Sequence, residues 1–219
     1  MMIKRAFLFA LYTLAFMLSG CSLPQIIVLH DPLSAEEHLK LGGIYDSQGK
    51  AGLARDQYRF AVKQAPENVR AWSLLGDSAF RLKDYPEAEK AYGRALDLDP
   101  KNGDLLNNLA WVYLQQEKRL GKAQELVQAA LVHAPARRPY YLDTLGVILL
   151  KDGKVPDAVA ALKESTETIP QDQPEFLAEA YLHLADAYQA AGDNSAADNA
   201  LKQRHALRPG PQKEPAIQP

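Results

Sequence analysis

The side chains that could do chemistry in this chain are few and scattered. There is one cysteine, Cys21, and there are five histidines: His30, His38, His133, His183 and His205. The spacings typical of zinc sites, metalloproteases and phosphate-binding loops do not occur. His183 and Asp186 are expected on one face of a helix over 178–190, but a metal needs more than two ligands. No motif places a Ser or Cys nucleophile beside a base. We therefore expect no catalytic site, no metal and no cofactor, and a protein that is not an enzyme. An enzyme with an unrecognised site is the alternative.

Composition narrows the function classes further. The chain has 219 residues, of which 47% are hydrophobic and 24% charged. These values are ordinary for a globular protein and exclude a wholly disordered chain or a multi-span membrane protein. The formal net charge is −2, so there is no excess of positive charge to attract phosphates. We expect no nucleic-acid partner and no small-molecule substrate.

The first residues have the pattern of a secretory signal. Lys4 and Arg5 precede an apolar run over 6–17, which is too short to span a membrane comfortably. The sequence Leu18-Ser19-Gly20-Cys21 follows and resembles the lipobox of bacterial lipoproteins. That resemblance implies a signal peptide over 1–20, cleavage before an acylated Cys21, and a tether over 21–34. It also implies a lipid-anchored protein of the cell envelope, on the periplasmic face of the outer membrane. An ordinary signal peptide with an incidental cysteine is the alternative.

The rest of the chain repeats itself with a period of about 34 residues. Prolines recur at spacings of 34, 35, 35 and 39: Pro66, Pro100, Pro135, Pro170 and Pro209. An alanine stands twelve residues before each: Ala54, Ala88, Ala123, Ala158 and Ala197. A leucine and a small residue recur near the start of each unit: Leu41-Gly42, Leu75-Gly76, Leu109-Ala110, Leu145-Gly146 and Leu184-Ala185.

This pattern resembles the tetratricopeptide repeat (TPR) family, most closely in Trp72-Ser73-Leu74-Leu75-Gly76. The resemblance implies an all-α fold, a right-handed α-α superhelix of about five helix pairs. The units it implies are 35–68, 69–102, 103–137, 139–172 and 178–209, followed by a disordered Pro-rich tail over 210–219. In this family the leucine and the small residue lie where the two helices of a pair meet, and the proline follows the second helix.

Two segments depart from the repeat. Residues 173–177 are extra, and we interpret them as a longer joint before the last unit, whose polar final helix over 196–207 caps the array. The apolar run Ile26–Leu29 either packs as a tether on the first helix pair or docks on a partner.

In TPR proteins a concave groove is lined mainly by the first helix of each pair. The resemblance places six residues there as a protein-binding site: Arg70, Asp77, Asn107, Trp111, Tyr140 and Asp143. Trp111 is either an exposed binding residue or a buried one, and one of Tyr140 and Tyr141 is expected to pack inward. We expect a membrane-anchored scaffold or adaptor that holds a neutral or basic protein segment and supports envelope assembly, secretion or cell-wall processes. The alternative is a passive stalk with no groove ligand.

Overall fold

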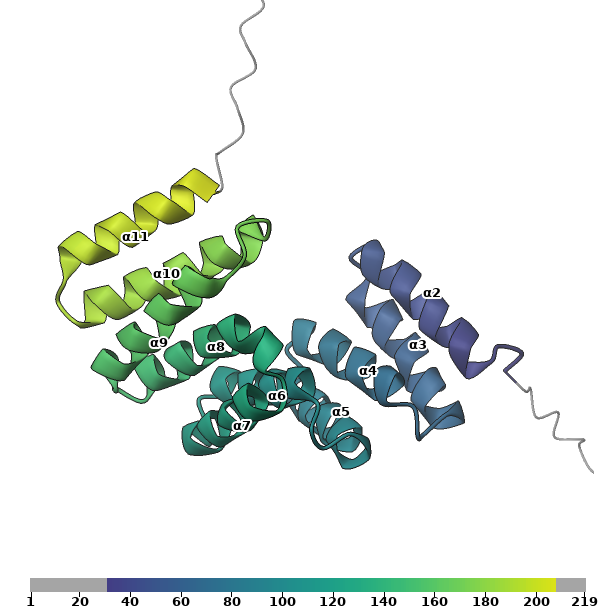
Figure 1. The fold of residues 1–219 in the computed structure, drawn as a ribbon. Helices are drawn as coiled ribbons and strands as arrows, with labels where there is room; N and C mark the ends of the chain where they lie inside the picture. Colours follow the sequence, from purple (N-terminus) through teal and green to yellow (C-terminus); the bar gives the residue numbers. More distant parts are fainter. Residues whose placement is uncertain (1–30, 208–219) are drawn as a thin grey trace, which may run out of the picture. The chain divides into compact units, whose positions relative to one another are not determined.

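The computed structural model describes residues 31–207, and these are all-helical apart from turns (Figure 1). The α-helices in this part of the chain are α2 (Ala35–Ser47), α3 (Ala51–Gln64), α4 (Val69–Arg81), α5 (Tyr85–Leu98), α6 (Gly103–Gln115), α7 (Leu120–His133), α8 (Arg138–Lys151), α9 (Val155–Thr168), α10 (Pro174–Ala190) and α11 (Asn194–Leu207). A 3-10 turn, η1 (Pro135–Arg137), precedes α8. The predicted signal peptide, Cys21, the 26–29 run and the 210–219 tail lie outside the described residues.

The ten helices form five consecutive pairs, which confirms the predicted architecture. Each helix packs on its neighbours in the sequence. The first helices of successive pairs also touch, α4 with α6, α6 with α8 and α8 with α10, so one side of the array is built from first helices. None of the helices described over 31–207 is both long and apolar enough to cross a membrane.

Local sequence fixes where the helices begin and end. Ser34 starts α2 with a capping box, in which its hydroxyl accepts from the Glu37 amide and Glu37 accepts from Ser34. Asn68 and Asn102 cap α4 and α6 in the simpler way, through the side-chain oxygen. The repeat prolines Pro66, Pro100, Pro135 and Pro170 each fall two residues after a second helix ends, because proline cannot continue a helix.

The glycines of the repeat allow the two helices of a pair to approach. A Cβ added at Gly76 would lie 2.6 Å from the Tyr92 ring, and one at Gly42 would lie 2.4 Å from the Tyr58 ring. At Gly146 the obstacle is Leu162, at 2.4 Å. The recurring alanines of the second helices are buried as well, with at most 1% of their surface exposed. The predicted meeting point of the two helices is therefore confirmed.

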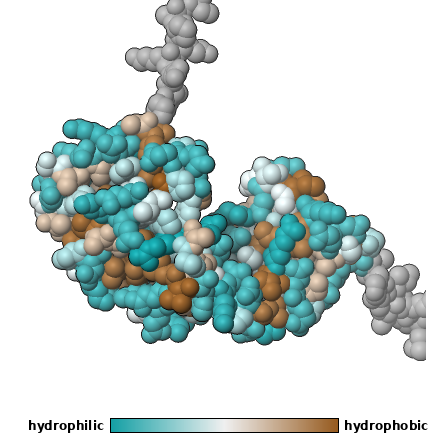
Figure 2. All heavy atoms as spheres, viewed as in Figure 1, coloured by the Kyte–Doolittle hydropathy of each residue, from teal (hydrophilic) through white to brown (hydrophobic). Residues whose placement is uncertain are grey.

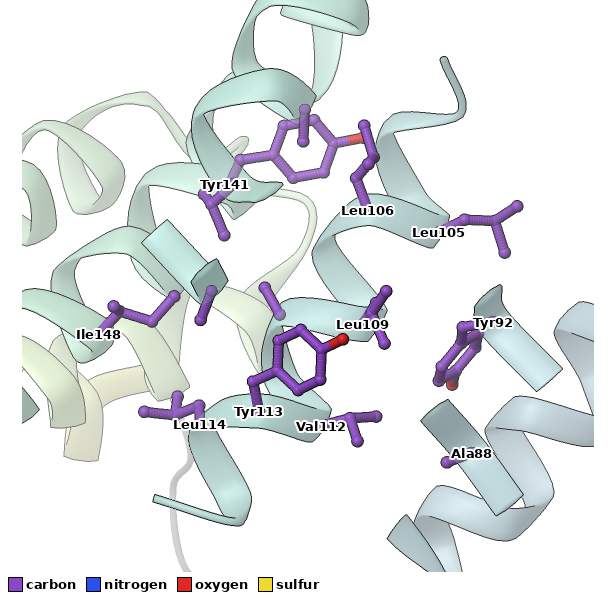
Figure 3. Packing of buried hydrophobic residues seen from close by; sticks show 14 of the residues in the cluster. Ala88, Tyr92, Leu105, Leu106, Leu109, Val112, Tyr113, Leu114, Tyr141 and Ile148 are labelled. Atoms are coloured by element: carbon purple, nitrogen blue, oxygen red, sulfur yellow. The ribbon is translucent and has the colours of Figure 1, made fainter. Parts of the chain in front are cut away.

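The largest cluster of buried side chains lies in the middle of the array (Figure 3). Helix α6 supplies more of its buried residues than any other helix, seven of the sixteen, with Leu105, Leu109 and Val112 among them. These pack between Ala88 and Tyr92 on the α5 side and Tyr141 and Ile148 on the α8 side (Figure 3). The middle of the array is thus a rigid base for the first helices that surround α6.

The segment before the last pair differs from the prediction. Helix α10 begins at Pro174, not at residue 178, so four of the five extra residues, 174–177, belong to the helix and not to a longer joint before it. Proline is well tolerated in the first turn of a helix, where its missing N–H would have no partner. Leu177 is buried in a small cluster with Ile169 and Ala180, and this packing holds the added turn in place.

Candidate binding groove

The first helices α4, α6, α8 and α10 surround a cavity of about 730 Å³, which we call the groove. In the space-filling view the surface is hollowed between α10 and α4, and the exposed surface around it is largely hydrophilic (Figure 2). Five of the six residues predicted for the groove line this cavity: Asp77, Asn107, Trp111, Tyr140 and Asp143. Side chains from successive repeats therefore meet in one place.

Arg70 is the predicted residue that the structure does not bring to the cavity. It is exposed in the first turn of α4, one turn before Ser73, where the α4 part of the lining begins. The family resemblance placed Arg70 in the groove together with Ser73 and Asp77, but it could not show where along the helix the cavity ends.

Trp111 is held between two repeats. Its indole Nε1 donates to the Thr144 hydroxyl at 2.9 Å, and Thr144 is buried on α8. The indole is half-buried, which falls between the two predicted alternatives. Its position is fixed before any partner arrives, so little side-chain entropy remains to be lost on binding.

Asp143 on α8 is paired with His183 on α10, whereas the sequence predicted that His183 and Asp186 lie together on one helix face. His183 Nδ1 lies 2.9 Å from one Asp143 oxygen and 3.0 Å from the other, whereas Glu179 is 3.9 Å from its Nε2. Burial alone would lower the pKa of His183, but the Asp143 hydrogen bond and the charges of Asp143, Glu179 and Asp186 outweigh it, so the pKa is raised. The Asp143 charge is thus largely compensated within the groove.

As predicted, one tyrosine of the Tyr140–Tyr141 pair packs inward and the other lines the groove. Tyr141 is buried and donates to Asp104 at 2.9 Å. Tyr140 lines the cavity and donates to the Gln173 side chain. The Tyr140 ring contacts the Phe176 ring edge-on at 5.4 Å between centroids, and the Arg137 guanidinium lies 5.0 Å from the Tyr140 centroid.

Two residues that line the groove, Phe176 and Arg137, were not predicted from the sequence. Phe176 was assigned to a linker, yet it lies in the first turn of α10 and is 58% exposed at the edge of the cavity. Arg137 lies in the 3-10 turn and pairs with Asp104 at 3.1 Å. A signal was available for Phe176, because a proline two residues earlier is typical of a helix start.

Two acceptors in the groove are less well compensated. Asp77 accepts from the Tyr92 hydroxyl at 2.7 Å and from the Asn108 amide at 3.4 Å, and both donors are neutral. Burial raises the pKa of Asp77 despite these bonds. The side-chain oxygen of Asn107 is buried without a hydrogen-bond partner among residues 31–207. These acceptors favour a ligand that brings donors or positive charge.

The described residues form no cluster of three or more His, Cys, Asp and Glu side chains that could hold a metal ion. His183 hydrogen-bonds Asp143 on the neighbouring helix α8, and it does not form a set of metal ligands with Asp186. What the groove offers is fixed aromatic surface beside amide and carboxylate groups, an arrangement suited to recognising a polypeptide.

Comparison with known proteins agrees with this fold. The curated relatives include the protein O-mannosyl-transferase Tmtc3 of Drosophila melanogaster, 35% identical over 124 residues that cover 52% of this chain and 13% of the relative. The type IV pilus assembly protein PilF of Pseudomonas aeruginosa is 30% identical over 106 residues, covering 46% of this chain and 40% of PilF. The chain therefore spans less than half the length of these relatives.

Among solved structures, the type IV pilus biogenesis factor PilW superposes with a TM-score of 0.72 at 23% identity, over 81% of this chain and 79% of PilW. Pseudomonas aeruginosa PilF superposes with a TM-score of 0.64, also at 23% identity, over 83% of this chain and 79% of that one. At this identity the likeness shows the fold alone, and it confirms the TPR solenoid.

Two family models match the repeats. A single tetratricopeptide repeat matches residues 178–203. The model described as the cytochrome c-type biogenesis protein H TPR domain matches residues 57–176, more than half of the 219 residues. The helix pairs, the packing at the repeat glycines and this match lead to one conclusion. The chain belongs to the tetratricopeptide repeat family represented by the cytochrome c-type biogenesis protein H TPR domain.

Proposed function

We propose that this TPR scaffold is a lipid-anchored adaptor that holds a segment of a partner protein in its groove. The observation that carries the proposal is the cavity lined by the first helices of four successive repeats, to which α4, α6 and α8 contribute Asp77, Asn107, Trp111, Tyr140 and Asp143. A passive stalk would have no need for aromatic side chains held in position between repeats.

The groove chemistry supports a polypeptide ligand. Trp111 and Tyr140 supply broad contact area, and both are already held by hydrogen bonds to neighbouring elements. The Asn107 amide can donate to and accept from a peptide backbone, and its unpartnered oxygen would gain a donor.

The anchor and the cellular role rest on sequence and relatives. Cys21 follows a lipobox-like sequence, and acyl chains on it would bury methylene groups in a bilayer at about 0.8 kcal/mol each. The names of relatives point to pilus assembly and cytochrome c biogenesis, which supports a part in assembly or secretion at the envelope. On this proposal the protein is an adaptor without catalytic activity, on the periplasmic face of the outer membrane.

The groove is tested by crosslinking in envelope membranes and recovery of partners with Trp111→Ala and Asp143→Lys. Removal of an anchoring aromatic should cost about 2 kcal/mol of binding, or about thirtyfold in affinity. Phe60→Ala is the matched control, because Phe60 is an exposed aromatic on α3 that does not line the groove. Each variant must first keep the helical circular dichroism signal and melting midpoint. Recovery of every partner at full yield by both groove variants would exclude this site.

The anchor is tested separately. Cys21→Ser should move the protein from the membrane pellet to the soluble periplasmic fraction, because the acyl chains can no longer be attached. Retention of this variant in the membrane at the level of the unmodified chain would contradict the lipid anchor and leave the groove proposal untouched.

A further inference from the structure

A side pocket opens off the groove between α4, α5 and α6. It encloses about 230 Å³ and is lined by Asp77, Phe80, Arg81, Tyr92, Asn108 and Trp111. It shares Asp77, Asn108 and Trp111 with the groove, so a side chain of a segment lying in the groove could enter it. We propose that this pocket takes the cationic end of a lysine or arginine side chain of the bound segment. The inference rests on the groove function proposed above and specifies one feature of its ligand.

The composition of the lining suits an organic cation. Three of the six residues are aromatic: Phe80, Tyr92 and Trp111. A cationic side chain gains from aromatic neighbours, and its methylene stem gains from the apolar surface that they present. A neutral aliphatic side chain would bury the Asp77 carboxylate further without compensating its charge, which is costly.

Asp77 is the carboxylate of the groove that lacks a cation. Asp104 pairs with Arg137 and Asp143 pairs with His183, but no Lys, Arg or His among residues 31–207 lies within ion-pair distance of Asp77. Its bonds come from Tyr92 and Asn108, which are neutral donors. Burial keeps the pKa of Asp77 above its ordinary value even though Tyr92, Arg81 and Asn108 act in the opposite direction. A guanidinium or ammonium group would supply the missing charge.

Arg81 lines the same pocket but does not fill this role. Its guanidinium is bound to Asp46 on α2, in the preceding repeat, and its side chain is 47% exposed. Asp46 also accepts from the Tyr58 hydroxyl at 2.8 Å, so this pair belongs to the contact between the first two repeats. Arg81 therefore leaves the carboxylate of Asp77 open to a cation from outside.

The test uses small probes, so it does not depend on knowing the partner. N-acetyl-arginine N-methylamide and its lysine counterpart are titrated into the chain, with the citrulline and norleucine derivatives as uncharged controls. Binding is followed by the indole N–H signals in ¹H–¹⁵N NMR spectra. The chain has two tryptophans, and Trp72 is the internal reference because its Nε1 donates to the Pro66 carbonyl at 2.7 Å and it does not line the pocket.

We expect the cationic probes to shift the Trp111 signal with a saturating, millimolar dependence and to leave Trp72 unmoved. Raising the ionic strength should weaken the effect, because part of the attraction is between charges. The uncharged probes should bind at least about tenfold more weakly, a difference of about 1.4 kcal/mol. An unmoved Trp111 signal at the highest probe concentration, or equal shifts with the citrulline derivative, would overturn the inference.

Asp77→Asn should reduce the affinity for the arginine probe at least about tenfold. Glu89→Gln is the matched control, because Glu89 also accepts from a tyrosine, Tyr113, but already has Arg119 as its cation and lines neither the groove nor the pocket. It should keep the affinity within about twofold. If Asp77→Asn does not fold, nuclear Overhauser contacts between the probe methylenes and the Trp111, Phe80 and Tyr92 rings of the unmodified chain locate the site, and their absence overturns the proposal.

The two proposals can fail separately. If the probes do not bind while Trp111→Ala loses the partner, the cation pocket is wrong and the groove function stands. If the probes bind at Asp77 while both groove variants recover the partner in full, the groove function is wrong and the bound segment is not the source of the cation.

Discussion

His183 is the residue whose charge the array controls most clearly. It lies on α10 and faces Asp143 on α8, Glu179 and Asp186 on its own helix, and the Trp111 ring on α6 at 6.3 Å between centroids. Burial disfavours the charged ring, but the three carboxylates more than offset it and raise the pKa above 6.5. The protonated ring therefore links α10 to α8.

This linkage predicts how stability depends on pH. Because the folded-state pKa of His183 is raised, its stabilisation is fully present below the unfolded pKa of about 6.5 and is lost as pH rises through the folded-state pKa. Asp143→Asn should lower the His183 pKa, since burial then weighs more. The Asp143→Asn variant should lose more stability at pH 6 than at pH 9, as measured by urea unfolding. The pKa of His183 is followed separately by NMR titration of its ring. An equal loss at both pH values, or an unchanged pKa, would contradict the pairing.

At the scale of the helix pair, stability depends on how closely two backbones approach. Gly76→Ala adds a Cβ that would lie 2.6 Å from the Tyr92 ring, and Tyr92 is held by its bond to Asp77. We expect a cost of about 1–3 kcal/mol in the free energy of unfolding, although alanine is the better helix former. Gly93→Ala is the matched control, because a Cβ at Gly93 meets nothing within 4 Å, and it should gain about 0.5–1 kcal/mol. Urea denaturation that gives both variants the same sign would refute the packing argument.

The elements that could be predicted from the sequence are those fixed by local rules. Gly42 and Gly76 revealed the close helix contacts, and the prolines marked where second helices end. The sequence predicts the last unit from residue 178, whereas α10 begins at Pro174, and the burial of Leu177 makes the added turn favourable. The proline in the first turn and the burial of Leu177 favour the same helix start.

The groove was predicted as a face but not as a set of contacts. The family resemblance put Asp77, Asn107 and Trp111 on the inner side, and in the structure they line the cavity. The pairs that hold the lining, Trp111 with Thr144 and Asp143 with His183, join residues 33 and 40 positions apart on different repeats. These contacts depend on how each repeat is rotated against the next, and the sequence of a single helix does not contain that angle.

At the scale of the described array, every strong contact is between neighbours. Helix α6 packs against α4, α5, α7 and α8, whereas α11 packs against α10. Eight residues of α6 are buried, but in α11 the buried residues are Ala197 and Ala200. In a repeat protein stability is the sum of such local terms, so it should decline from the middle toward the last helix.

Hydrogen exchange measures this decline directly. Amides of α6 should exchange only through large-scale unfolding, because opening α6 exposes the central cluster of Leu105, Leu109 and Val112. Amides of α11 should exchange at least about tenfold faster, through separation of that helix from α10. Gly76→Ala should speed exchange in α4 and α5 more than in α10 and α11, because the perturbation passes from one repeat to the next. Mass spectrometry of peptides from each helix gives both results. Uniform protection along residues 35–207, or equal acceleration at both ends, would show that the array unfolds as one cooperative block and not as linked repeats.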